Sequence, residues 1–198
     1  MQNRKIELHI WIEGTIAAAM AMVLSLIPTS IGSSFSVSLG MIPMVLYSLR
    51  RGAKAGVFSA FIWGLLHFPL GQVYFLTPFQ VVIEYLLAFG FTGFAGLFSS
   101  QLKTTIQAGN AKKSRRIIFV ATFTGTVARY FWHFIAGVIF WGSFALWGMN
   151  PWLFSFLMNG LSGVATAIVT ATVLVIVLKI APQLFVPSYQ IFRKQPKS

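Results

Sequence analysis

The chain has 198 residues, of which 57% are hydrophobic and 9% are charged, and its mean hydropathy is +0.78. Soluble domains carry about 25% charged residues, and disordered chains have low hydrophobicity. The composition therefore excludes both classes and predicts an integral membrane protein. The sequence has no cysteine, which excludes disulfide bonds and thiolate nucleophiles or ligands.

Six apolar segments are long enough to cross a membrane, since a helix of about 20 residues spans a hydrocarbon core of about 30 Å. They do not alternate apolar and polar residues, which favours helices over the strands of a barrel. The second segment is short, so we expect it to be tilted or broken near Gly40 and Pro43. The sequence predicts a single all-α membrane domain over residues 1–198, a six-transmembrane-helix bundle with helices at about 10–27, 35–49, 55–70, 77–99, 117–141 and 152–180.

Lysine and arginine residues lie in alternate connections between these segments. The connections 28–34, 71–78 and 142–151 contain neither residue. Because cationic residues near the ends of spans are retained in the cytoplasm, both termini are predicted to be cytoplasmic and these three connections external. This arrangement accounts for the net charge of +12 without a nucleic-acid partner. The cations on the cytoplasmic side are Arg4, Lys5, Arg50, Arg51, Lys54, Lys103, Lys112, Lys113, Arg115, Arg116, Lys179, Arg193, Lys194 and Lys197.

Two ionisable residues of opposite charge are expected well inside the bilayer, Glu84 in the fourth segment and Arg129 in the fifth. Such residues are costly in a membrane and indicate either a functional site or a buried partner. One hypothesis is an ion pair between them that holds two helices together. The other is a polar anchor for a ligand, which is favoured because Tyr85 follows Glu84 and because His133 shares a helix face with Arg129.

Other polar and aromatic residues near the external side support a ligand site. Asn159, in the sixth segment, has an amide that both donates and accepts hydrogen bonds. Trp63, Tyr74 and Trp141 are candidates for an aromatic cage, because aromatic faces hold organic cations and planar rings. Together with one carboxylate, they favour a heterocyclic ligand that carries positive charge or an amino group.

The sequence contains no catalytic motif such as HExxH and no GxxxxGK phosphate-binding loop. The histidines His9, His67 and His133 are scattered and make a weak metal set. We therefore expect neither an enzyme nor a bound metal or cofactor. In the first segment, Thr15 with Ala19, and Ala17 with Ala21, give a spacing that lets another helix approach closely, either within this chain or from a partner.

Several sequence blocks, in the same order and at similar spacing, resemble the thiamine-specific substrate-binding (S) components of energy-coupling factor (ECF) transporters of Gram-positive bacteria. The blocks are Leu26-Ile27-Pro28, Ser48-Leu49-Arg50-Arg51-Gly52, residues 62–66, Glu84-Tyr85-Leu86, residues 133–137 with Phe140-Trp141, and Asn159-Gly160 with Ser162-Gly163. The resemblance implies a cell-membrane subunit that binds thiamine at its outer side and hydrolyses nothing itself. It would deliver thiamine through a transmembrane coupling subunit driven by two cytoplasmic ATPases.

The resemblance also implies roles for individual residues. Glu84, His133 and Asn159 would hold the aminopyrimidine ring of thiamine, and Trp141 would stack on its ring system. Thr15 and Ala19 would form the surface that meets the coupling subunit. Further contributors to the ligand site would be Tyr85, Tyr74, Trp63 and Phe154.

Three positions depart from the family pattern: Ser34 stands where relatives carry a tryptophan, Ser38 where they can carry an acid, and Phe154 where they carry a tyrosine. These departures leave open a lower affinity or a related ligand, such as an aminopyrimidine precursor of thiamine. Two other classes of protein also stay open. One is a structural or assembly membrane protein, in which a Glu84–Arg129 ion pair only holds two helices together. The other is a self-contained proton-coupled carrier, in which Glu84 binds and releases the proton.

Overall fold

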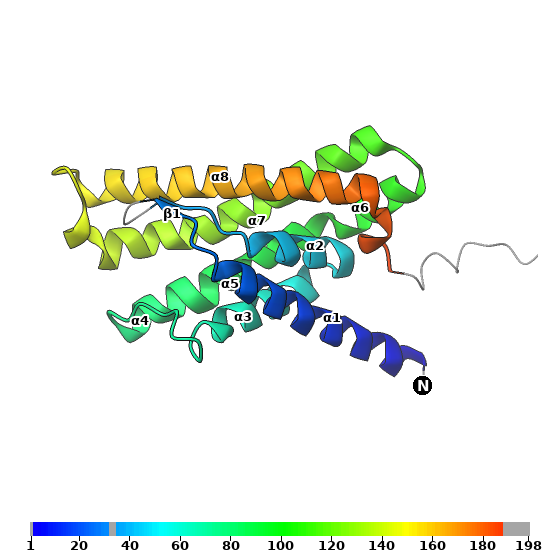
Figure 1. Ribbon diagram of the computed structural model, residues 1–198, viewed down its shortest axis with the longest axis horizontal. Helices are drawn as coiled ribbons and strands as arrows, with labels where there is room; N and C mark the ends of the chain where they lie inside the picture. Colours follow the sequence, from blue (N-terminus) through cyan, green and yellow to red (C-terminus); the bar gives the residue numbers. More distant parts are fainter. Residues whose placement is uncertain (1, 32–34, 188–198) are drawn as a thin grey trace, which may run out of the picture.

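The computed structural model describes residues 2–31 and 35–187, with side chains from residue 7 onward. Ser34 and the cations Arg193, Lys194 and Lys197 lie outside the described residues. Six helical segments form a bundle (Figure 1): α1 (Gln2–Ser25), α2 (Met41–Arg51), α3 (Ala53–Leu66), a composite helix over Pro78–Gln107, α7 (Ala111–Phe140) and α8 (Pro151–Ile180). The N-terminus, the turn between α6 (Ser99–Gln107) and α7, and the last turns of α8 gather at one end of the bundle.

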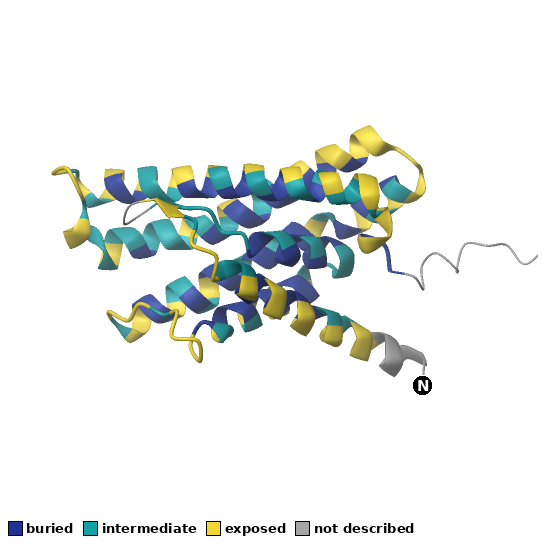
Figure 2. Cartoon of the chain, viewed as in Figure 1, coloured by how far each residue is buried: buried dark blue, intermediate teal, exposed yellow. Residues whose placement is uncertain are grey.

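Three of the described helical segments are apolar enough and long enough to cross a membrane: Glu7–Ser25, Pro78–Gln107 and Pro151–Ile180. The helix α3 is a shorter apolar helix. The helix α7 has 30 residues, but its first two turns carry Lys112, Lys113, Arg115 and Arg116. Large apolar side chains are exposed along the outer faces of α1 and α8, where lipid would cover them (Figure 2). The expectation of an all-helical membrane fold with six helices is confirmed.

The second helix begins later than the sequence indicated. We expected it from residue 35, but α2 begins at Met41, directly after Gly40. Pro43 lies in its first turn, where the missing N–H of proline leaves no hydrogen bond unmade. The preceding residues are extended: β2 (Phe35–Ser36) pairs antiparallel with β1 (Ser30–Ile31).

Side chains of α8 explain why this segment is extended. The backbone N–H of Ser36 donates to the hydroxyl of Ser162 at 3.1 Å, and that of Ser38 donates to the hydroxyl of Thr166 at 3.0 Å. A buried backbone N–H needs a hydrogen-bond acceptor. If this segment were helical, its own carbonyl groups would be the acceptors, but here the hydroxyls of α8 take their place. The segment is therefore held against α8 without helical hydrogen bonds.

The composite helix is not a regular α-helix. It runs through α4 (Pro78–Val81), a π-helical segment η1 (Val82–Leu87), α5 (Ala88–Phe91), a 3-10 segment η2 (Thr92–Phe98) and α6. A π-helical turn is rare and often marks a functional site. Gly64 of α3 lets the Tyr85 carbonyl of η1 approach closely, because a Cβ at Gly64 would overlap that carbonyl oxygen.

An ionic cluster joins three elements at the middle of α1. Glu13 accepts hydrogen bonds from Arg50 Nε at 2.9 Å and from Arg51 Nε at 2.6 Å. Arg50 also donates to the carbonyl oxygens of Gln183 and Leu184, at 3.1 and 3.2 Å. The cluster therefore ties α1 and α2 to the chain that follows α8.

Candidate functional site

A polar cavity of about 460 Å³ lies at the end of the bundle opposite the α6–α7 turn. It is bounded by the chain between α1 and α2, by the loop after α3, and by α7 and α8. These elements meet here because the extended segment at residues 35–38 is held against α8. The lining residues are 24–30, 36–39, His67, Gln72, Tyr74, Arg129, Tyr130, His133, Asn159 and Ser162.

Arg129 is the cation of this cavity, and it is only 6% exposed. Its guanidinium donates to the Ser38 hydroxyl at 2.8 Å and lies over the rings of Phe89 and Trp63, with centroids at 4.2 and 4.7 Å. The ion pairs of the described side chains join Glu13 to Arg50 and Arg51. Arg129 and Glu84 are not paired, so the hypothesis of a structural pair between α7 and η1 is wrong for this structure.

His133 lies one turn after Arg129 on α7 and is oriented by it. Arg129 Nε donates to His133 Nε2 over 3.4 Å. Because a guanidinium has no acceptor, Nε2 of the imidazole must accept, and Nδ1 is then the nitrogen that carries the proton. The imidazole also contacts the Tyr130 and Phe89 rings, with centroids at 5.6 and 6.3 Å. His133 can therefore offer one N–H donor to a ligand in the cavity.

Glu84 stands at the centre of a second polar network beside the cavity. Its carboxylate accepts hydrogen bonds from the Gln80 amide and from the Trp141 indole, the latter at 3.0 Å. Gln80 also donates to the Tyr74 carbonyl at 3.1 Å, and the Tyr85 hydroxyl accepts from the Tyr74 N–H at 3.0 Å. The rings of Tyr74 and Trp141 meet edge to face at 6.3 Å. These hydrogen bonds join the loop between α3 and α4, the segment η1 and the end of α7 in one network.

The predicted ligand residues fall into three groups. Tyr74, His133 and Asn159 line the cavity. Glu84, Tyr85 and Trp141 do not line it but are linked to it through Tyr74.

The third group lies away from the cavity wall. Trp63 is fully buried beneath Arg129, and its indole donates to the Ser25 hydroxyl at 3.2 Å. Phe154 is buried on α8 and meets the Trp147 ring at 6.3 Å. The tyrosine-to-phenylalanine departure at Phe154 therefore does not change the lining of the cavity.

Several lining residues were not predicted as ligand contacts, among them His67, Gln72, Tyr130 and Ser162. For Ser162 a signal was present, because Asn159, Ser162 and Thr166 share one face of a helix at spacings of three and four. Tyr130 lies next to Arg129 on α7 and could have been noticed there. His67 and Gln72 follow the end of α3, and no local sequence pattern placed them at the cavity.

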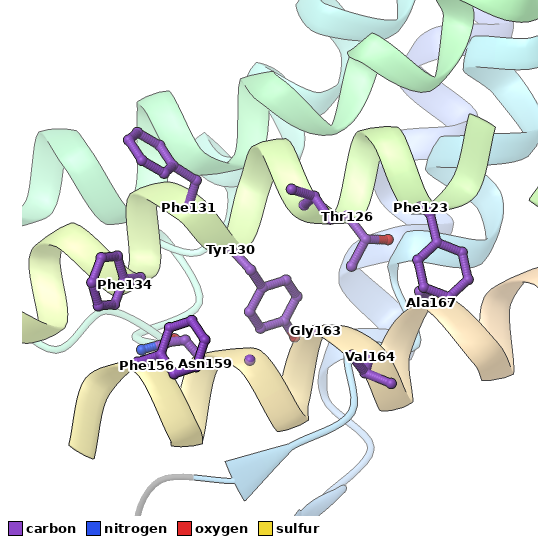
Figure 3. Close-up of a pocket in the computed structure, with 12 residues that line it drawn as sticks. Phe123, Thr126, Tyr130, Phe131, Phe134, Phe156, Asn159, Gly163, Val164 and Ala167 are labelled. Carbon is purple, nitrogen blue, oxygen red and sulfur yellow. The ribbon is translucent and has the colours of Figure 1, made fainter. Parts of the chain in front are cut away.

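Tyr130 and Asn159 also line an apolar groove of about 380 Å³ between α7 and α8 (Figure 3). Because both residues line the polar cavity as well, they stand between the two. The Tyr130 hydroxyl shares a hydrogen bond with Thr166 at 3.0 Å, and the Asn159 amide donates to the Ser155 carbonyl at 3.1 Å. Gly163 lies under the Tyr130 ring, which leaves room for that ring between the helices. Both side chains are therefore fixed in the wall of the cavity.

A polar cavity within a membrane-type helical bundle, lined by aromatic rings and hydrogen-bonding groups, is typical of a membrane protein that binds a small solute, and transport proteins form a large part of that class. The sequence comparisons agree. The model of the family described as thiamine transporter protein (Thia_YuaJ) matches residues 11–186, and the chain belongs to this family. The resemblance found in the sequence is thereby confirmed, as is the expectation of a multi-pass transport protein that is not an enzyme.

Individual relatives are similar over nearly the whole chain. The thiamine transporter ThiT of Lacticaseibacillus paracasei is 37% identical over 190 residues, which cover 94% of each protein. The thiamine transporter ThiT of Bacillus subtilis is 34% identical over 187 residues, which cover 92% of this chain and 96% of the relative. A solved structure of ThiT from Listeria monocytogenes is 49% identical, with a TM-score of 0.90 over 91% of this chain and 99% of that one.

Proposed function

We propose that this chain binds thiamine at the external end of the bundle and acts as the S component of an ECF transporter. Family membership supports the ligand class, and one structural observation carries the proposal. A single carboxylate, Glu84, is held by two donors beside a polar cavity that already contains His133 and Asn159. This combination suits an aminopyrimidine that is joined to a cationic ring.

The hydrogen-bonding capacity of Glu84 is not exhausted by its protein partners. Each carboxylate oxygen accepts up to two hydrogen bonds, and each accepts one here, from Gln80 and from Trp141. The remaining capacity can accept the exocyclic amine of the pyrimidine in a charge-assisted bond. Because Tyr74 is 75% exposed and separates Glu84 from the cavity, we expect its side chain to move when the ligand enters.

The positive charge of thiamine requires compensation within the membrane protein. The rings of Tyr74 and Trp141 offer faces to the thiazolium, since aromatic rings attract cations. Arg129 is fixed on the far side by Ser38 and repels a second cation. We therefore expect the thiazolium to lie nearer to Trp141 than to Arg129.

Delivery into the cell would proceed through the coupling subunit, driven by two cytoplasmic ATPases. The face of α1 that contains Thr15 and Ala19 is exposed, whereas Ala17 and Ala21 are buried inside the chain. Of the two small-residue pairs, only the first is therefore free to meet another subunit at close range. This arrangement supports Thr15 and Ala19 as the docking surface, with both termini in the cytoplasm of a Gram-positive cell.

Titration of the purified protein in detergent tests the ligand. Thiamine is expected to quench tryptophan fluorescence saturably, because Trp141 borders the site. Glu84→Gln and His133→Ala should each weaken binding at least about tenfold, which corresponds to the loss of one charged or buried hydrogen bond. Glu7→Gln and His9→Ala are the matched controls, because both residues lie near the start of α1 and are exposed.

The outcomes separate the alternatives. If the aminopyrimidine precursor quenches the fluorescence and thiamine does not, the precursor is the ligand, and the proposed binding site is retained. Absence of quenching by thiamine, its phosphates and the precursor would reject the proposal. Uptake by this protein alone in vesicles, driven by a pH gradient, would favour the proton-coupled carrier over an ECF component.

A further inference from the structure

A second cavity, of about 540 Å³, is lined by residues at the turn between α6 and α7. Figure 1 shows this turn at the end of the bundle opposite to the loop between α7 and α8. Three cations from the first turns of α7 line one part of it, namely Lys112, Lys113 and Arg116. Phe98 and Val120 line another part and are apolar. The cavity therefore combines a cationic region with an apolar one.

None of the described residues that line this cavity is acidic. The chain has three acidic residues in all. Glu7 lies on α1 and does not line the cavity, Glu13 is paired with Arg50 and Arg51, and Glu84 lies in η1 beside the thiamine site. The cationic region thus carries a net positive charge that no lining residue neutralises, and it is complementary to an anion.

The two regions of the cavity follow each other along one face of α7. Lys113, Arg116, Ile117 and Val120 are spaced by three, one and three residues, which places them on the same side of the helix. At 1.5 Å per residue, Lys113 and Val120 are about 10 Å apart along the helix axis. The cations are exposed at the helix end, and Val120 is 44% exposed one to two turns further into the bundle.

We infer that this cavity binds an anionic phospholipid. Its phosphate lies against Lys112, Lys113 and Arg116, and the first part of an acyl chain lies against Phe98 and Val120. Basic residues next to a membrane span attract anionic headgroups. The preference for cations on the cytoplasmic side explains why Lys112, Lys113 and Arg116 lie here. It does not explain why they line a cavity that also has an apolar wall.

The apolar wall also decides against two other occupants. A free phosphate ion would gain nothing from Phe98 and Val120. An acidic protein surface would have to reach Val120, at a depth on α7 where lipid chains or another transmembrane helix lie. A glycerophospholipid has an anionic headgroup followed by apolar acyl chains, so it matches a cationic region that is followed by an apolar one.

Native mass spectrometry of the purified protein tests the inference. The protein is incubated with equal amounts of phosphatidylglycerol and phosphatidylcholine, and retained lipid is counted. We expect preferential retention of one phosphatidylglycerol. Replacement of Lys112, Lys113 and Arg116 by Gln should abolish this preference, and Arg116→Gln alone should weaken retention about fivefold, as expected for one cation at a headgroup. Val120→Trp should weaken it by filling the apolar part.

Arg115→Gln is the matched control, because Arg115 is an exposed neighbour that does not line the cavity. Thermal unfolding of every variant checks that the fold is retained. Equal retention of both lipids, or a triple variant that behaves like Arg115→Gln, overturns the inference. Displacement of phosphatidylglycerol by millimolar inorganic phosphate would show an anion site that does not use the acyl chain. Displacement by polyglutamate would show an acidic protein partner, and either result rejects a lipid site.

Discussion

The indole nitrogen of Trp141, at the end of α7, donates a hydrogen bond to Glu84 at 3.0 Å and joins α7 to the π-helical segment η1. The bond fixes the carboxylate that we propose as the thiamine anchor. It also makes Trp141 more than an aromatic surface, because its N–H has a defined acceptor. The two contributions of Trp141 can be separated by a substitution that keeps the ring.

Trp141→Phe keeps an aromatic face and removes the N–H donor to Glu84. We expect thiamine affinity to fall about threefold to tenfold, because a hydrogen bond to a charged group is lost while ring contact remains. Isothermal titration calorimetry measures the change. Trp152→Phe is the control, since Trp152 is 60% exposed on α8, where its ring meets that of Phe134 away from Glu84. Equal affinity of Trp141→Phe and the control would mean that the Trp141–Glu84 bond does not contribute.

Arg129 provides a prediction about stability. It is buried already, and the Ser38 hydroxyl is its closest hydrogen-bond acceptor. A bond from a guanidinium to a carboxylate is stronger than one to a neutral hydroxyl. Ser38→Asp should therefore raise the melting temperature by about 2–6 °C, since about 1–2 kcal/mol corresponds to such a shift in a chain of this size. Ser38→Asn, which adds the same volume without charge, is the control. A Ser38→Asp protein that melts no higher than Ser38→Asn would contradict this account.

The general fold could be predicted from the sequence because apolar length alone defines membrane helices. The start of α2 could not, because the acceptors that hold residues 36 and 38 extended are Ser162 and Thr166, which lie more than 120 residues further along the chain. No local pattern contains that information. The π-helical form of η1 is hidden for the same reason, since it is accompanied by a close approach to Gly64 of α3.

The candidate site shows the same division. Rare polar residues within apolar segments identified Glu84, His133 and Asn159, because each is conspicuous against its neighbours. How these residues are arranged relative to one another was not evident from the sequence. Glu84 was the expected partner of Arg129, but Arg129 donates to Ser38 instead. Charge alone suggested the pair, whereas helix packing placed the two residues in separate networks.

Gly64 offers a direct test of the packing around η1. A Cβ at this position would overlap the Tyr85 carbonyl oxygen, which is backbone and cannot move aside as a side chain would. Gly64→Ala should therefore cost about 1–3 kcal/mol and lower the melting temperature by about 2–10 °C. Gly160→Ala is the matched control, because among the described residues no atom outside its own helical turn lies within 4 Å of its Cβ position. Helix propensity predicts that this control is neutral or slightly stabilising, so equal losses in both variants would rule out the close approach as the cause.

The exposed small residues of α1 lead to a prediction about assembly. Ala19→Trp should block co-purification with the coupling subunit and abolish energised uptake, because a large ring at this face prevents close approach of another helix. Thiamine binding by the isolated variant should remain unchanged, because Ala19 does not line the binding cavity. Leu161→Trp is the control, since Leu161 is 54% exposed on α8 and a tryptophan there also faces lipid. Normal uptake by Ala19→Trp would move the docking surface away from this face of α1, whereas loss of both binding and uptake would indicate a defect in folding rather than in assembly.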